Sequence, residues 1–310
     1  MAACTVASVR AGGKQIQGRL TYNAGMSACE KGGQWEHALS LLVGLCEAQL
    51  EPDVISFNAG ISACAKCGQW GRAMSLLVWL SAADLEPDII SYSAVVSACE
   101  KGGHWKQALS ILKTLLDSQV EPNVIAYSSG ISACATGGQW QQALSLLDGL
   151  CDARLEPNVV SYNAAITACE KGEQWQQALL LFAGLRAVRL EPDIISYSAG
   201  ISACEKGGRF QQALFLLREM REARTTPAVI SYSAGVSACG KGGEWQLALS
   251  LLSELQEVKL VPDAISATTL ASVLARRAAS GSMRWCCCAS WPHRQRDQIS
   301  SATTPLSVRA

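Results

Sequence analysis

The sequence predicts an all-α solenoid of helix-turn-helix repeats, and three regularities support this prediction. An aromatic residue, a second aromatic residue that is nearly always Trp, and a Pro each return every 35 positions, as from Tyr22 to Phe57. Apolar residues between these markers recur at helical spacing, and Gly and Pro interrupt that spacing once each per period. Fixed periods of this size are typical of stacked units, each too small to bury its own apolar faces.

The three markers keep their period through seven copies. The first is Tyr22, Phe57, Tyr92, Tyr127, Tyr162, Tyr197 and Tyr232; the second is Trp35, Trp70, Trp105, Trp140, Trp175, Phe210 and Trp245; the third is Pro52, Pro87, Pro122, Pro157, Pro192, Pro227 and Pro262.

Residues 1–18 form an extension before the repeats. They hold Arg10 and Lys14 and no acid, and they lack the apolar core of a secretory signal. An organellar transit peptide and a decayed earlier repeat both fit this composition. The seven repeats then occupy residues 19–263.

The second repeat shows how each unit divides into two helices. Phe57, Ile61 and Cys64 share one face of a first helix, and Gly68 ends it. A second helix begins near the Trp marker, and the next Pro prevents it from continuing. Its apolar positions are Trp70, Ala73, Met74, Leu77 and Leu80. Asp88 or Ser91 is placed to cap the next first helix, and the large Trp is suited to pack as a wedge between successive hairpins.

A partial eighth repeat or capping helix is expected over 264–280, where Ala267 replaces the first aromatic marker. Ser, Arg, Trp and a Cys triplet fill 281–310, which we expect to be a disordered tail. The triplet is too tightly spaced to hold one tetrahedral zinc ion well.

Seven of the 14 cysteines recur at one position of the repeat. Equivalent residues of stacked helices lie roughly 9–10 Å apart, beyond the roughly 7 Å that a disulfide spans. We therefore expect reduced, buried thiols in a reducing compartment. This Cys ladder is Cys29, Cys64, Cys99, Cys134, Cys169, Cys204 and Cys239.

Composition and charge exclude several classes of protein. Of 310 residues, 49% are hydrophobic and 17% charged, so the chain can bury a core. Lys+Arg and Asp+Glu both number 26, so no global positive field indicates a nucleic acid. No apolar run approaches a membrane span. No enzyme motif is present. The C-x-x-C pair of Cys64 and Cys67 lies inside a predicted helix and occurs in one repeat only, so we interpret its spacing as a chance occurrence and expect no bound metal or cofactor.

The repeats resemble the pentatricopeptide repeat family of the 35-residue type. The resemblance lies in the period, the Val/Ile-x-Ser-Tyr-Asn/Ser start, the "ALSLL" second helix and the closing "EPD" or "EPN", and it covers about four-fifths of the chain. No Leu-Gly-x-x-Tyr block of tetratricopeptide repeats occurs. The resemblance implies a right-handed superhelical solenoid that binds single-stranded RNA without catalysis, guiding or protecting a transcript in a chloroplast or mitochondrion. Other RNA-processing proteins are expected partners; a membrane or a small-molecule substrate is not.

The resemblance also implies which residues read the bases, namely the fifth residue of each unit together with its last, while the aliphatic second residue packs on the base. The reading pairs are Asn23 with Asp53, Asn58 with Asp88, Ser93 with Asn123, Ser128 with Asn158, Asn163 with Asp193, Ser198 with Ala228 and Ser233 with Asp263; the packing residues are Leu20, Ile55, Ile90, Ile125, Val160, Ile195 and Ile230. In the second unit, Ile55, Asn58 and Ser62 share a helix face distinct from the apolar one, which would line the concave groove of the solenoid.

Taken in order, these pairs resemble readers of 5′-UUAAUNG-3′, with C tolerated where U is written. Ala228 departs from the pattern, because its side chain has no hydrogen-bonding group, and it leaves the sixth base open. One alternative is that the residue after each Pro only caps a helix. Another is that the whole chain is a protein-interaction scaffold whose groove binds a peptide or a partner helix.

A row of lysines near the end of each first helix is the candidate phosphate contact. Its members also suit the helix dipole, and neighbouring acids dilute their charge. The row is Lys31, Lys66, Lys101, Lys171, Lys206 and Lys241, interrupted at Thr136.

Overall fold

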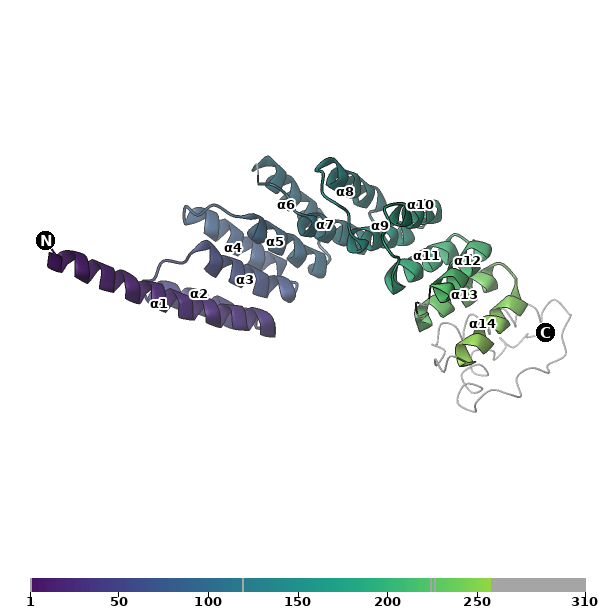
Figure 1. Ribbon diagram of the computed structural model, residues 1–310, viewed down its shortest axis with the longest axis horizontal. Coiled ribbons are helices and arrows are strands. Elements are labelled where there is room, and N and C mark those ends of the chain that lie inside the picture. The colour runs from purple at the N-terminus through teal and green to yellow at the C-terminus, as the bar shows by residue number, and fades with distance from the viewer. Residues whose placement is uncertain (1, 119, 224, 226, 258–310) are drawn as a thin grey trace, which may run out of the picture. The chain divides into compact units, whose positions relative to one another are not determined.

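The computed structural model describes residues 2–118, 120–223, 225 and 227–257, and these residues form fourteen α-helices and no strand (Figure 1). The predicted all-α fold of helix-turn-helix repeats is confirmed. The helices are α1 (Ala2–Gly32), α2 (Trp35–Glu47), α3 (Val54–Lys66), α4 (Trp70–Ala82), α5 (Ile89–Gly102), α6 (Trp105–Asp117), α7 (Val124–Thr136), α8 (Trp140–Asp152), α9 (Val159–Lys171), α10 (Trp175–Ala187), α11 (Ile194–Lys206), α12 (Phe210–Glu222), α13 (Val229–Lys241) and α14 (Trp245–Glu257).

The chain divides into two compact units, Met1–Ala168 and Cys169–Ala310. In the first unit the first helices of successive repeats, α1, α3, α5 and α7, pack side by side, and α2, α4 and α6 each pack against the first helices of their own and of the following repeat. In the second unit α11 packs against α13 in the same way, and α12 contacts both. Each unit is therefore built from nearest-neighbour contacts, as expected for stacked repeats.

The residue after the Pro marker is the N-cap of most first helices, which begin one position later. Asp53, Asp88 and Asp193 are N-caps in extended conformation, and each carboxylate accepts a hydrogen bond from the backbone N–H of a Ser three residues later. That Ser completes a capping box by accepting from the N-cap backbone. Asn123 caps α7 by accepting from the backbone N–H of Ala126, without a capping box, while Ala228, the N-cap of α13, makes no side-chain bond. The predicted capping role is thus confirmed.

The turn between the two helices of a repeat requires a left-handed residue. Gly33, Gly68, Gly103, Gly138, Gly208 and Gly243 have φ between 65° and 78°. The fifth repeat has Glu173 at this position, with φ 58°. A residue with a Cβ is strained in this conformation, by roughly 1 kcal/mol.

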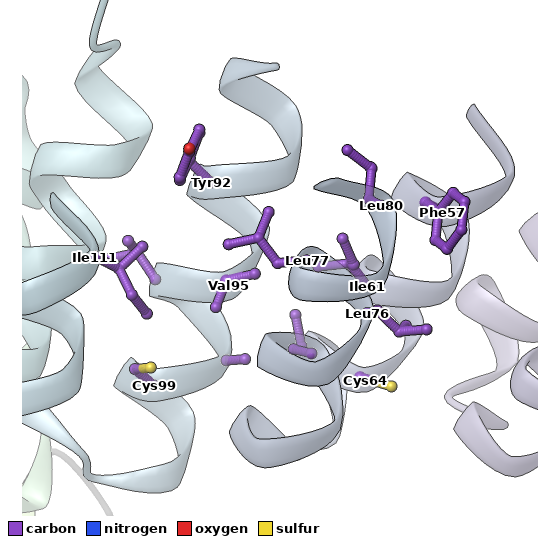
Figure 2. Packing of buried hydrophobic residues seen from close by; sticks show 14 of the residues in the cluster. Phe57, Ile61, Cys64, Leu76, Leu77, Leu80, Tyr92, Val95, Cys99 and Ile111 are labelled. Atoms are coloured by element: carbon purple, nitrogen blue, oxygen red, sulfur yellow. The ribbon is translucent and has the colours of Figure 1, made fainter. Parts of the chain in front are cut away.

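The apolar face of the first helices is buried, and Figure 2 shows Phe57, Ile61 and Cys64 of α3 in this core. One expectation about the second helix is wrong. Met74 is 36% exposed, whereas Leu76 is buried and packs where Gly60 of α3 has no side chain. The buried face of α4 is wider than one helical stripe because α4 contacts both α3 and α5.

The Cys ladder behaves as predicted within the described chain. Cys29 is half-buried and the six later members are fully buried, and the described cysteines form no disulfide. Burial raises the pKa of each buried thiol from 9.0 to about 11, so they are small neutral core residues at physiological pH.

The second aromatic marker is a wedge between repeats, as predicted. A Cβ built on Gly137 would lie 2.4 Å from the Trp105 ring, and one built on Gly207 would lie 2.4 Å from the Trp175 ring. Phe210 contacts Gly242 in the same way. The aromatic ring of one repeat therefore occupies space left by a Gly at the end of the next first helix.

The structure describes residues 2–18, before the first repeat, but not the residues after Glu257. Helix α1 runs from Ala2 through residue 18 without a break, and the assignment of 1–18 to a transit peptide or a decayed repeat stays a prediction. Asp263, the partial repeat 264–280 and the predicted tail 281–310 lie outside the described residues. Among the described helices, none is long and apolar enough to span a bilayer.

Candidate nucleic-acid interface

The second repeat shows the candidate reading site in full. Ile55 and Asn58 are on α3, and Asp88 is the N-cap of α5 in the next repeat. The Asn58 amide Nδ2 donates to Asp88 Oδ1 at 3.0 Å and lies 3.2 Å from Oδ2. The structure therefore brings the two predicted reading residues, 30 positions apart, into direct contact.

A third residue completes this contact. Ser91 Oγ lies 2.5 Å from Asn58 Oδ1 and 2.9 Å from Asp88 Oδ1. Because a carboxylate only accepts hydrogen bonds, the NH₂ group of Asn58 must face Asp88, and its carbonyl then faces the Ser91 hydroxyl. The amide is therefore held in one orientation.

The first repeat has the same arrangement and one addition. Asn23 Nδ2 donates to Asp53 Oδ1 at 3.3 Å, and Ser56 Oγ lies 2.6 Å from Asn23 Oδ1. Arg19, which occupies the position of a Val or Ile in later repeats, forms an ion pair with Asp53 at 3.3 Å. The first two predicted U sites therefore differ in charge.

The Asp53 and Asp88 carboxyls are ionised at neutral pH. Burial raises the pKa of each, but hydrogen bonds to the carboxylates outweigh burial and hold both pKa values below the ordinary value. The donors are the backbone and hydroxyl of the capping Ser and the amide of the preceding Asn; Arg19 adds its charge at Asp53.

The units with Ser at the fifth position have a different pattern. Ser93 donates to Ile90 O at 3.2 Å, and Ser233 donates to Val229 O at 2.7 Å. Ser128 Oγ is 2.8 Å from Ser161 Oγ. Among the described residues, neither Ser93 nor Ser128 contacts the last residue of its own unit, so in these two units the short hydroxyl does not span the distance that Asn58 spans.

The remaining reading positions are only partly placed. Asn163 is buried in the first compact unit, and Asp193 caps α11 in the second. Ser198 Oγ lies 2.8 Å from Ser231 Oγ and donates to Ile194 O at 2.7 Å. Ala228 makes no side-chain cap, as expected, and the partner of Ser233, Asp263, is outside the described residues.

The aliphatic second residues are exposed in every repeat. Their exposed fractions run from 55% to 65%, unlike the buried Phe57 face of the same helices. Seven aliphatic side chains at a 35-residue period thus remain uncovered, beside the nearly buried polar reading residues. The row is Leu20, Ile55, Ile90, Ile125, Val160, Ile195 and Ile230.

Half of the predicted phosphate contacts are already paired. Each ion pair joins a Lys to the acid 36 positions earlier, in the preceding repeat. The pairs are Lys66 with Glu30 at 3.4 Å, Lys206 with Glu170 at 3.1 Å and Lys241 with Glu205 at 3.1 Å. Lys101 and Lys171 have Ala65 and Ala135 at that earlier position and, like Lys31, form no ion pair with a described residue.

Sequence reasoning missed two parts of this interface. One is the contact between the Ser three positions after the N-cap and the reading residue of the preceding repeat; Ser91 was expected only as a possible cap, although the 35-residue recurrence of this Ser was available as a signal. The other is the 36-residue spacing from Glu to Lys. The C-x-x-C pair, by contrast, gives no metal site: Cys67 donates its S–H to Gly33 O at 3.1 Å, and the described residues contain no group of three or more metal ligands.

Tandem helical hairpins with a 35-residue period define a helical-repeat protein, and in its first two repeats Asn23 and Asn58 contact the N-cap of the next first helix. The model of the pentatricopeptide repeat domain matches residues 75–137, 121–174, 145–207 and 180–242, and that of the single repeat matches 20–48, 55–78 and 230–260. The chain belongs to the pentatricopeptide repeat family.

Solved structures share this fold at low sequence identity. The crystal structure of the pentatricopeptide repeat protein PPR10 from maize matches with a TM-score of 0.58 and 19% identity, over 96% of this chain and 46% of that one. The repeat domain of protein-only RNase P 1 from Arabidopsis thaliana, solved in complex with tRNA, matches with a TM-score of 0.52 and 13% identity, over 58% of this chain and 94% of that one. The chain spans about half the length of the maize protein. No curated protein matches it.

Proposed function

We propose that the chain binds single-stranded RNA without catalysis, with one nucleotide per repeat and a preferred sequence near 5′-UUAAUNG-3′. One observation carries the proposal: the Asn58 amide is held in one orientation by Asp88 and Ser91, beside an exposed Ile55. An amide in a fixed orientation offers a donor and an acceptor to a base edge, and the aliphatic side chain offers it an apolar surface. Proteins of this family read one base per helical repeat with two or three side chains.

The cellular role follows from the family. We propose that binding guides or protects a transcript in an organelle, and that any further processing activity is contributed by partner proteins. Seven bases give modest selectivity, since one mismatched contact costs on the order of 1 kcal/mol, the lower end for base-edge readout.

A protein-interaction scaffold is the second candidate. The observation that favours it is the pairing of three lysines with glutamates, which leaves few free cations along the row. The exposed aliphatic row would then contact apolar side chains of a peptide.

Selection from a randomised RNA pool, followed by sequencing, tests the proposal. The enriched motif should be 5′-UUAAUNG-3′ or its U-to-C variants. The affinity for 5′-UUAAUUG-3′ should then be compared with that for the scrambled 5′-AUUGUAU-3′, which has the same composition and phosphate charge. Equal affinities, or no enriched motif, would refute sequence-selective binding, and no RNA binding at low salt would favour the scaffold.

A further inference from the structure

Two repeats carry the same predicted reading letters but hold them differently. The third unit has Ser93 and Asn123, and the fourth has Ser128 and Asn158, so the resemblance assigns A to both. The residue three positions after the last letter differs, however: it is Ala126 after the third unit and Ser161 after the fourth.

In the fourth unit a chain of hydrogen bonds fixes the reading hydroxyl. Ser161 donates its backbone N–H and its Oγ–H to Asn158 Oδ1, both at 2.9 Å. Either hydroxyl can donate at the 2.8 Å contact between Ser128 and Ser161. A hydroxyl has one proton and Asn158 Oδ1 can only accept, so we assign the Ser161 proton to Asn158 and the donor role at this contact to Ser128. Ser128 then has only lone pairs to offer a base, while the NH₂ of Asn158 has no partner among the described residues.

In the third unit this chain is missing. Ala126 has no hydroxyl, although its N–H still donates to Asn123 Oδ1 at 2.8 Å, so the helix remains capped. The Ser93 hydroxyl instead makes a long bond of 3.2 Å to Ile90 O of its own helix. This weaker bond leaves the hydroxyl free to rotate and either donate or accept.

We propose that the third residue of each repeat is a positioning residue for the base reader of the preceding repeat, an inference that rests on the proposed RNA-reading function. On the Watson–Crick edge, adenine presents a donor at N6 and an acceptor at N1, whereas guanine presents an acceptor at O6 and a donor at N1, so the order is opposite. A hydroxyl that can only accept distinguishes the two orders, whereas one that rotates serves both. The fourth unit therefore discriminates A from G more strongly than the third.

The same slot acts on the asparagine readers. Ser56 and Ser91 contact the carbonyl oxygens of Asn23 and Asn58 at 2.6 and 2.5 Å. These contacts, like the one from Ser161, reach back 33 positions into the preceding repeat. The third residue of a repeat thus contacts both kinds of reading residue.

The test compares three RNAs, 5′-UUAAUUG-3′, 5′-UUGAUUG-3′ and 5′-UUAGUUG-3′, with the wild-type chain and the variants Ser161→Ala and Ala126→Ser. Fluorescence anisotropy at one salt concentration gives the ratio of the Kd for G to the Kd for A at the third and fourth bases. In the wild type, the ratio at the fourth base should exceed that at the third by about fivefold, the effect of one net hydrogen bond.

The two variants should change opposite positions. Ser161→Ala should lower the ratio at the fourth base to the wild-type value at the third, and Ala126→Ser should raise the ratio at the third base by about fivefold. Each variant leaves the other position as its internal control. Because Ala126 occurs naturally at this slot, Ser161→Ala should fold, and thermal unfolding checks this.

The outcomes separate the inference from the proposed function. A preference for A that is equal at both bases, or that neither variant alters, would overturn the positioning role and leave the base code standing. Weaker binding of both RNAs by Ser161→Ala with an unchanged ratio would also overturn it, because a merely structural residue would act so. No preference for A at either base would overturn the base code itself, and the inference with it.

Discussion

Replacing Glu30, Glu170 and Glu205 together by Gln should release three lysines and increase the salt dependence of RNA binding. These acids pair with Lys66, Lys206 and Lys241 in the next repeat. A lysine held by a carboxylate neutralises a phosphate only after that ion pair separates, so the paired lysines contribute little to counterion release. Glutamine removes the charge and keeps the size of the side chain.

The expected size of the effect follows from the number of free lysines. Each phosphate neutralised on a single strand contributes about −0.7 to the slope of log K against log salt. The three lysines without an ion pair give the wild type a slope of about −2, and the triple variant, with six, should reach about −4. Stability should change little, since the lysine side chains of these pairs are 35–50% exposed and such pairs contribute at most about 1 kcal/mol each.

Titrations with 5′-UUAAUUG-3′ at several salt concentrations measure the slope. A matched control replaces Glu51, Glu121 and Glu156 by Gln, which changes the net charge equally at exposed positions of the linkers, where no ion pair to a described residue occurs. The control should bind somewhat more tightly with a slope close to the wild-type value. Equal slopes for the wild type and the triple variant would show that the lysine row does not contact phosphates.

Four further predictions concern single features. Asn58→Ser should move the preferred second base from U to G by on the order of 1 kcal/mol, measured by competition between 5′-UUAAUUG-3′ and 5′-UGAAUUG-3′; an unchanged preference would restrict Asn58 to a structural role. Gly137→Ala should destabilise by about 1–3 kcal/mol because its Cβ would overlap Trp105, while Gly71→Ala, with open space around it, should stabilise by about 0.5–1 kcal/mol in denaturant unfolding; similar values for the two would refute the wedge. Glu173→Gly should stabilise by about 1 kcal/mol by relieving its positive φ, and a loss of stability would contradict this. Finally, the melting temperature should fall as the pH rises from 9.0 to about 11, because the buried thiols stay protonated in the folded state while the thiols of the unfolded chain lose their protons. A constant melting temperature in this pH range would show that the thiols are accessible to solvent in the folded state.

The structural features within a single hairpin could be predicted from the sequence. Helix positions, the turn at Gly68 and the cap at Asp88 follow from local spacing, because each depends on residues fewer than about ten positions apart. The burial of Leu76 in place of Met74 was not predictable in this way, since it depends on how α4 fits between two first helices.

The contacts that build the candidate interface were harder to predict. Asn58 meets Asp88 and Ser91 at separations of 30 and 33 residues, and Lys66 meets Glu30 at 36. Such pairs become visible only when the stacking of adjacent first helices sets their register. The family resemblance supplied the first of these pairs, but neither the resemblance nor the period indicated the serine or the glutamate partners.

The cap at the start of each first helix restricts how this surface can change during evolution or design. Asp88 caps α5 and also accepts a hydrogen bond from the amide of Asn58. A substitution of Asp88 therefore affects both the stability of the helix and the position of the reading residue. Only a few residue types are good N-caps, chiefly Asp, Asn, Ser and Thr. Few substitutions at this position are therefore well tolerated, and any other residue type destabilises the next hairpin by about 1 kcal/mol. Ala228 shows that one repeat of the array tolerates a residue that cannot cap the helix through its side chain. The sixth repeat is therefore the natural place to begin when a new binding preference is engineered.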